Sequence, residues 1–212
     1  YYLGGPNANF GGGLSPFIDM LKAKGVCGPV VLHVADGVYN ANVTIPGIYG
    51  MSAVNTVTIR GVSQDSSKAV FSGSSGSFSS ALVSLSGADH FHFEYVGFEH
   101  TGTTGSSSLI NISQQAGFNT FSNCRFRPRG TSVRASVQAN SYNRYLNNHF
   151  STGTGIDLTA SSSGEGTIIE GNIFDSMGSS ILVQNQSDLM IRNNLITNSA
   201  SGITLESCSS FQ

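Results

Sequence analysis

The sequence YLNNHF at residues 145–150 is one copy of a six-residue pattern that recurs through residues 88–200. Each copy begins with a large apolar residue and has another one five positions later. The copies are FEYVGF (93–98), FSNCRF (121–126), YLNNHF (145–150), IEGNIF (169–174) and IRNNLI (191–196). Their final apolar residues follow one another at intervals of 28, 24, 24 and 22 residues. A recurrence of this length predicts a solenoid, in which one supersecondary unit stacks on the next.

A second, shorter apolar segment precedes most copies, and Ser and Gly are frequent in the intervening stretches. Its apolar residues alternate or run together over three or four positions, which is typical of strands rather than helices. These segments are residues 82–85, 109–112, 156–158, 181–183 and 203–205. Two or three short strands per repeat, joined by tight polar turns, predict an all-β solenoid, the parallel β-helix. Its consecutive coils would pair along flat parallel sheets around a continuous core.

Three successive copies have Asn two residues before the final apolar residue, at Asn148, Asn172 and Asn194. Stacked amides can hydrogen-bond from coil to coil, as they do in cross-β stacks. Asn is also common in turns, but the shared register favours a ladder that ends at Cys124 and Val96. The large apolar residues of the copies would then form two interior stacks. These are Phe93/Phe121/Tyr145/Ile169/Ile191 and Phe98/Phe126/Phe150/Phe174/Ile196.

The apolar-x-Asn-Asn-x-apolar copies resemble those of right-handed parallel β-helix proteins, the pectate-lyase-like superfamily. Residues 28–46, GPVVLHVADGVYNANVTIP, are similar to the entry coil of many secreted β-helix proteins. The helix-then-strand order is similar to the β-helix modules of large secreted bacterial surface proteins. The resemblance covers nearly the whole chain and implies a right-handed parallel β-helix. It implies much less about activity, because this fold carries many functions.

One α-helix is expected, at about residues 15–25. Ser15 would cap it, Pro16 suits its first position and Gly25 its end. We expect this helix to cover the N-terminal end of the solenoid, where an end coil otherwise exposes apolar core and strand edges. Residues 1–212 are expected to form a single β-helix domain, truncated or continued at its C-terminal end. The rest of a longer chain, or a partner, would then cover the last coil.

The composition restricts the possible partners and the location. Only 10% of the residues are charged and the net charge is −2, so the basic footprint of a nucleic-acid-binding protein is missing. No apolar run is long enough for a membrane span. The sparse charge, with abundant Ser and Gly, suits a secreted or cell-surface protein. Three cysteines cannot all pair within the chain, and no Cys or His spacing indicates zinc. We predict no metal and no cofactor.

No catalytic residue is predicted, because the seven Asp residues are scattered and no Asp-Asp pair occurs. Polysaccharide lyases and hydrolases of the superfamily that the chain resembles use clustered acidic residues. The best polar cluster lies on the outward face of the strands that carry the repeats. Alternation in the strands would place five charged or ionisable side chains there, on one face within a few coils. They are His92, Glu94, Arg144, Glu170 and Arg192.

Two interpretations of this face stay open. It could bind a saccharide or perform acid–base chemistry, or it could be a solvated sheet face whose charges prevent aggregation. We favour a non-catalytic module of a secreted or surface protein, a rigid stalk or adhesin that binds polysaccharide or other surface proteins. The alternative is the N-terminal portion of a polysaccharide lyase or glycoside hydrolase. Ice binding would need regular Thr-x-Thr rows, and the outward rows are mixed.

Overall fold

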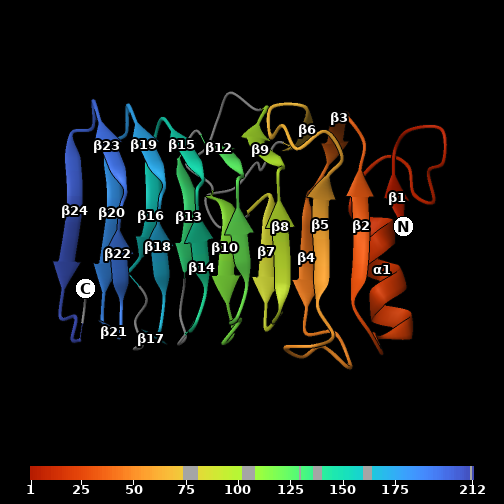
Figure 1. The fold of residues 1–212 in the computed structure, drawn as a ribbon, viewed down its shortest axis with the longest axis horizontal. Coiled ribbons are helices and arrows are strands. Elements are labelled where there is room, and N and C mark those ends of the chain that lie inside the picture. The colour runs from red at the N-terminus through yellow and green to blue at the C-terminus, as the bar shows by residue number, and fades with distance from the viewer. Residues whose placement is uncertain (74–80, 102–107, 129, 136–139, 160–163, 211) are drawn as a thin grey trace.

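The computed structural model is a parallel β-helix, a column of coils with the helix α1 at its N-terminal end (Figure 1). It describes residues 1–73, 81–101, 108–128, 130–135, 140–159, 164–210 and 212. Within these ranges the strands form three long parallel sheets, here called A, B and C, and one sheet of two strands. From β2 onward each coil contributes one strand to each long sheet, in the order A, B, C, and β1 adds an eighth strand to sheet A. The predicted all-β solenoid and right-handed parallel β-helix are therefore confirmed.

Sheet A carries the outward face on which the candidate site was predicted. Its strands are β1 (Tyr2–Leu3), β2 (Val30–Val34), β5 (Val57–Gly61), β8 (Phe91–Glu94), β11 (Thr120–Ser122), β14 (Arg144–Leu146), β18 (Ile168–Glu170) and β22 (Met190–Arg192). Sheet B follows it around each coil. Its strands are β3 (Gly37–Asn40), β6 (Ala69–Gly73), β9 (Gly97–His100), β12 (Arg125–Arg127), β15 (His149–Ser151), β19 (Ile173–Asp175) and β23 (Leu195–Thr197).

Sheet C closes each coil. Its strands are β4 (Val43–Pro46), β7 (Val83–Ser86), β10 (Ser108–Ser113), β13 (Thr131–Ala135), β16 (Thr154–Leu158), β20 (Ser179–Gln184) and β24 (Ser201–Glu206). The short sheet pairs β17 (Gly164–Glu165) with β21 (Gln186–Ser187). The second apolar segments predicted from the sequence lie mostly in sheet C, so the three-strand version of the predicted coil is correct.

The two predicted interior stacks form as expected. In sheet A, Phe93 pairs with Phe121, Phe121 with Tyr145, and Tyr145 with Ile169. In sheet B the rings of Phe126, Phe150 and Phe174 stack nearly parallel, with centroids 4.7 Å apart at both steps. The sheet B stack also extends further towards the N-terminus than predicted, through Phe71 to Tyr39. These rings are buried, so they pack the core and bind no ligand.

The predicted amide ladder is present. Asn148 donates from Nδ2 to Asn172 Oδ1 at 3.0 Å, and Asn172 donates from Nδ2 to Asn194 Oδ1 at 2.9 Å. The same two oxygens also accept the backbone N–H groups of Asn148 and Asn172, at 2.9 Å each. The other hydrogen of each amide goes to a backbone carbonyl of the preceding coil. These acceptors belong to Phe121, Tyr145 and Ile169.

Cys124 takes the place of an amide where the ladder ends. Its thiol donates to the Phe93 carbonyl at 3.3 Å, in register with the carbonyls that accept from the Asn side chains. Its own backbone N–H donates to Asn148 Oδ1 at 2.9 Å. Cys124 is therefore a buried member of the ladder, as the sequence suggested. A second, shorter Asn ladder was not predicted; in it the backbone N–H of Asn119 donates to Asn143 Oδ1 at 3.0 Å.

The helix α1 (Ser15–Lys24) lies at the N-terminal end of the solenoid and buries Phe17, Ile18 and Leu21 there (Figure 1). Its position confirms the predicted cap on the end coil. The predicted role of Ser15 is wrong, because the N-cap is Leu14 and no side chain caps the first turn. Gly25 ends the helix with a positive φ of 66°, as predicted. That a further segment or a partner covers the last coil stays a prediction.

Candidate functional site

The outward face of sheet A has the register that the sequence predicted. One row runs through Glu94, Ser122, Leu146, Glu170 and Arg192. The parallel row runs through His92, Thr120, Arg144, Ile168 and Met190. All five predicted site residues therefore lie on one face, although they occupy different strands along it.

The acidic residues of this face are already paired with arginines. Arg60 Nε lies 2.6 Å from Glu94 Oε2. At the other end of the row, Arg192 forms a bidentate ion pair with Glu170: Nε lies 2.9 Å from Oε1, and Nη2 lies 3.0 Å from Oε2. Arg60 lies on β5 and Arg192 on β22, so each carboxylate pairs with a residue on the side away from the other carboxylate.

This arrangement keeps the two carboxylates apart. Strands β8 and β18 are separated by β11 and β14. Three strand spacings correspond to about 14 Å between their backbones. The paired carboxyl groups of glycosidases are roughly 5–9.5 Å apart. Glu94 and Glu170 therefore do not form such a pair.

His92 projects from β8 on the same face and is half-buried. Burial lowers the pKa of its imidazole below the usual value of 6.5, while the nearby Glu94 carboxylate acts in the opposite direction. His90 and Arg144 lower it further through their own charges. His92 is therefore neutral near pH 7, and it does not add positive charge to the face.

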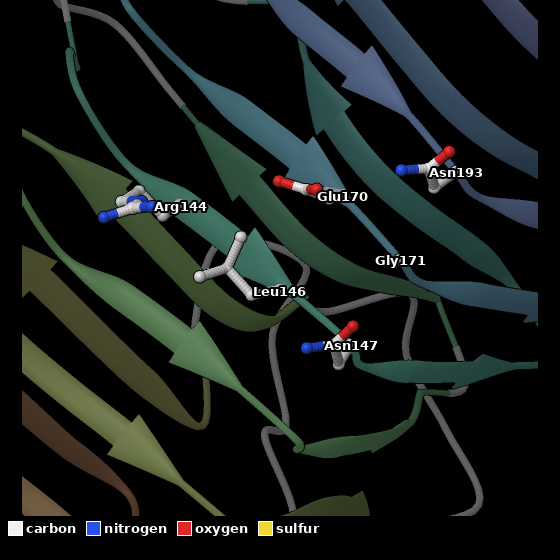
Figure 2. Close-up of a pocket in the computed structure, with 6 residues that line it drawn as sticks. All are labelled: Arg144, Leu146, Asn147, Glu170, Gly171 and Asn193. Atoms are coloured by element: carbon white, nitrogen blue, oxygen red, sulfur yellow. The ribbon is translucent and has the colours of Figure 1, made fainter.

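A hollow of about 350 Å³ opens beside Arg144 and Glu170. It is lined by Arg144, Leu146, Asn147, Glu170, Gly171 and Asn193. Figure 2 shows Arg144 and Leu146 on β14, Glu170 on the neighbouring β18, and the carboxamides of Asn147 and Asn193 at the strand ends with Gly171 between them. Arg144 is exposed, and it takes part in none of the ion pairs found among the described residues.

The turn that follows each sheet A strand explains the shape of this hollow. Its first residue has a positive φ in five successive coils, a conformation that Asn and Gly tolerate best. These residues are Tyr95, Asn123, Asn147, Gly171 and Asn193. Gly171 has no side chain, so it leaves a gap between two carboxamides. A Cβ at Gly171 would overlap the side-chain oxygen of Asn147, which leans over it.

The first Asn of each Asn-Asn pair therefore has a different role from the second. The first forms the left-handed turn and points its amide outward, whereas the second belongs to the buried ladder. Arg60, Asn147, Gly171 and Asn193 were not among the predicted site residues. The alternation of Asn and Gly at the first position was the signal for three of them. Arg60 would have been found by aligning residues 57–60 with residues 91–94.

Comparison with known families shows to which family the chain belongs. Residues 94–212, more than half of its length, match the family described as periplasmic copper-binding protein (NosD). The chain belongs to the NosD family. The match begins at Glu94 and covers every coil that contributes to the hollow. Comparison with curated proteins finds no match.

Solved structures resemble this NosD-family chain in fold. The crystal structure of Escherichia coli ybhc is similar with a TM-score of 0.65 and 10% identity, over 100% of this chain and 71% of that one. A pectin methylesterase mutant in complex with a hexasaccharide is similar with a TM-score of 0.60 and 11% identity. That match covers 92% of this chain and 65% of the esterase. At these identities the similarity shows the parallel β-helix alone.

The family and the fold together indicate a periplasmic or extracellular β-helix protein. This is coarser than the predicted secreted or cell-surface location and is consistent with it. In the part of the chain that the structure describes, no helix has the length and apolarity needed to cross a membrane.

Proposed function

We propose that the chain is a non-catalytic β-helix module that binds a glycan in the hollow on sheet A. One observation carries this proposal. The exposed guanidinium of Arg144, which has no ion-pair partner among the described residues, lies beside an apolar side chain and two outward carboxamides. The rigid stack of coils would present this hollow as a stalk or adhesin does. Polysaccharide is the proposed partner, and other surface proteins are the second class.

The chemistry of the lining suits a sugar with an acidic group. Leu146 offers an apolar surface for the C–H face of a sugar ring. The carboxamides of Asn147 and Asn193 can both donate and accept hydrogen bonds from hydroxyls. Arg144 can donate two parallel hydrogen bonds to a carboxylate or a sulfate. Because Arg192 neutralises Glu170, the hollow has a net positive charge.

The remaining predicted residues would act around the hollow. Arg192 would hold Glu170 in place, and Glu94 with its partner Arg60 would bound the face on the other side. Neutral His92 would offer a hydrogen bond. The alternative, a portion of a lyase or hydrolase, needs convergent carboxylates. Glu94 and Glu170 offer no such pair on this face.

Copper is the ligand that the family description names. The described residues contain no group of three or more His, Cys, Asp or Glu that could hold a metal ion. The residues that line the hollow include one carboxylate and no His, Cys or Met, so they do not fit copper. The proposal for the hollow therefore includes no metal.

The proposal is tested by affinity electrophoresis of the purified chain against a panel of neutral and acidic polysaccharides. Gly171→Asn should displace the Asn147 carboxamide and narrow the hollow while keeping the left-handed turn, since Asn occupies the same turn position in neighbouring coils. Arg144→Gln should remove its charge. We expect at least one acidic polysaccharide to retard the protein, and we expect both variants to lose roughly tenfold in affinity, or about 1.4 kcal/mol.

Arg127→Gln is the matched control, because Arg127 is an exposed arginine on sheet B that pairs with Glu99 at 3.6 Å. It should bind as the wild type does. Retardation that is the same in all four proteins would remove the hollow from the proposal. Shortened chains, unsaturated ends or released methanol after incubation with the wild type would overturn the non-catalytic part.

A further inference from the structure

Each side chain of this chain that could bind copper can be compared with the ligands that copper prefers. Cys and Met sulfurs suit copper(I), and imidazole suits copper(II). The chain has five His, three Cys and four Met residues. None of them falls in the segments that the structure leaves undescribed, which contain only Ala, Arg, Gln, Gly, Phe, Ser, Thr and Val. The same holds for all twelve carboxylate residues. Every side chain of these types in residues 1–212 therefore lies in the part of the chain that the structure describes.

The three thiols lie on different coils. Cys27 is exposed between α1 and β2, and Cys208 follows β24 at the opposite end of the solenoid. Cys124 is buried between β11 and β12, and burial raises the pKa of its thiol to about 12. Copper binds the thiolate, and the Cys124 proton is engaged with the Phe93 carbonyl. No two cysteines can therefore share a metal.

The histidines are dispersed as well. His33 lies on β2 and stacks on Tyr2 with a centroid distance of 5.1 Å. His100 is buried at the end of β9, and His149 is exposed on β15. These three positions are on different strands and, for His33, on a different sheet. None of them belongs to a group of three potential ligands among the described residues.

His90 and His92 are the two histidines that lie near each other in sequence. His90 occupies a left-handed turn, and its ring stacks on Phe118 at 5.0 Å. His92 projects from β8 close enough to Arg144 for the positive charge to lower its pKa. The Glu94 carboxylate acts in the opposite direction on this pKa, but its Oε2 lies 2.6 Å from Arg60 Nε. Among the described residues the two histidines belong to no group of three potential ligands.

The methionines do not complete a copper site with the cysteines or with the histidines. They lie in α1, in the loop before β5, next to β20 and at the start of β22, as Met20, Met51, Met177 and Met190. Met190 lies on the same outward row as His92 but four strands further along sheet A. Met177 is buried in the core.

We infer that residues 1–212 of this chain hold no copper site of their own, although the family to which the chain belongs is described by copper binding. This inference rests on the placement of the ligands and is independent of the proposed glycan binding. Within this stretch the β-helix acts as a scaffold. A copper ion bound by a larger assembly would need ligands that this stretch does not supply.

The test is a copper titration of the purified chain. Copper(II) is added and the sample is dialysed against EDTA; copper(I) is added under reducing conditions and competed with bathocuproine. Metal is then counted by mass spectrometry, and thermal unfolding is followed with and without copper. We expect far less than one copper per chain after competition and an unchanged unfolding midpoint, since a ligand that does not bind the native state does not stabilise it.

One copper per chain that survives the chelator and raises the unfolding midpoint would overturn the inference. His92→Gln and Cys27→Ser identify the ligands in that case. A single exposed thiol should bind copper(I) only weakly. Complete removal of copper(I) by bathocuproine, together with no uptake by Cys27→Ser, therefore supports the inference. Electron paramagnetic resonance of the copper(II) sample gives a second readout: nitrogen hyperfine structure from several imidazoles would contradict the inference.

Discussion

The buried amide column and the outward row of sheet A run side by side, only two residues apart in each coil, yet they are built differently. Inside, Asn148, Asn172 and Asn194 repeat the same bonds from coil to coil. Outside, the row that contains Glu170 changes from acidic to polar to apolar and back. The interior needs identical neighbours because each amide is bonded by the next. The exterior is in contact with water, so each position can differ and carry local chemistry.

The largest effect is expected inside the column. Asn172→Ala removes the oxygen that accepts from both the backbone and the side chain of Asn148, and it leaves the Tyr145 carbonyl without its amide partner. Leaving several buried groups unsatisfied should cost about 3 kcal/mol or more. Urea unfolding should show a lower midpoint with an unchanged slope. Asn193→Gly, which alters the exposed turn in the next coil, should cost little, and equal losses in both variants would remove the distinction.

The next prediction concerns an interior position that does not follow its stack. Tyr145 stands in a column with Phe93 and Phe121, and its buried hydroxyl has no hydrogen-bond partner in the described structure. Tyr145→Phe should therefore raise the free energy of unfolding, by about 1 kcal/mol. The control is Tyr142→Phe, because that exposed hydroxyl donates to Glu165 at 2.7 Å. A stability gain in the control, or none at Tyr145, would contradict the assignment.

A smaller effect is expected for the outward ion pair. Glu170→Gln breaks the two-point contact with Arg192, but Arg192 is more than half exposed. Such pairs contribute up to about 1 kcal/mol. The loss in urea midpoint should shrink in concentrated salt, which screens exposed charges. A loss as large as that of Asn172→Ala would mean that the outer row supports the coils as strongly as the column does.

The smallest effect is a dependence of stability on pH at His92. Burial lowers its pKa in the folded state below 6.5. As pH falls, His92 of the unfolded chain therefore takes up a proton before His92 of the folded chain. The free energy of unfolding is highest above pH 6.5 and decreases between pH 6.5 and the lowered pKa. Titration of the imidazole by NMR should give a midpoint below 6.5. His92→Gln should flatten this part of the pH profile, and an unchanged profile would assign it to another group.

The interior could be predicted from the sequence because repetition makes it visible. A column such as Phe126–Phe150–Phe174 appears as a regular spacing, and the strand register follows once the spacing is known. The register then placed His92, Glu94 and Arg144 on one face correctly. The second ladder, Asn119 and Asn143, was missed because it has two members instead of three.

The site itself could not be read in the same way. The order of the row places Glu94 and Glu170 three strands apart, but it does not give the neighbour with which each carboxylate pairs. Arg60 lies 34 residues before Glu94, outside the regular interval, so the partner that turns Glu94 away was not seen. The hollow lies beside Gly171, which has no side chain. The spacing of the repeats was read from side chains that are present, so it did not reveal the hollow.

The amide column has a consequence for how such a protein can change in length. Asn148 and Asn172 are 24 residues apart, and the bonds that enter one rung are the same as those that leave it. Copying one such segment within the gene would insert a rung without creating a new kind of contact. The rod would grow by about 4.8 Å for each copy. The length of the rod can thus evolve in fixed increments. The outward side chains of the new rung are free to diverge.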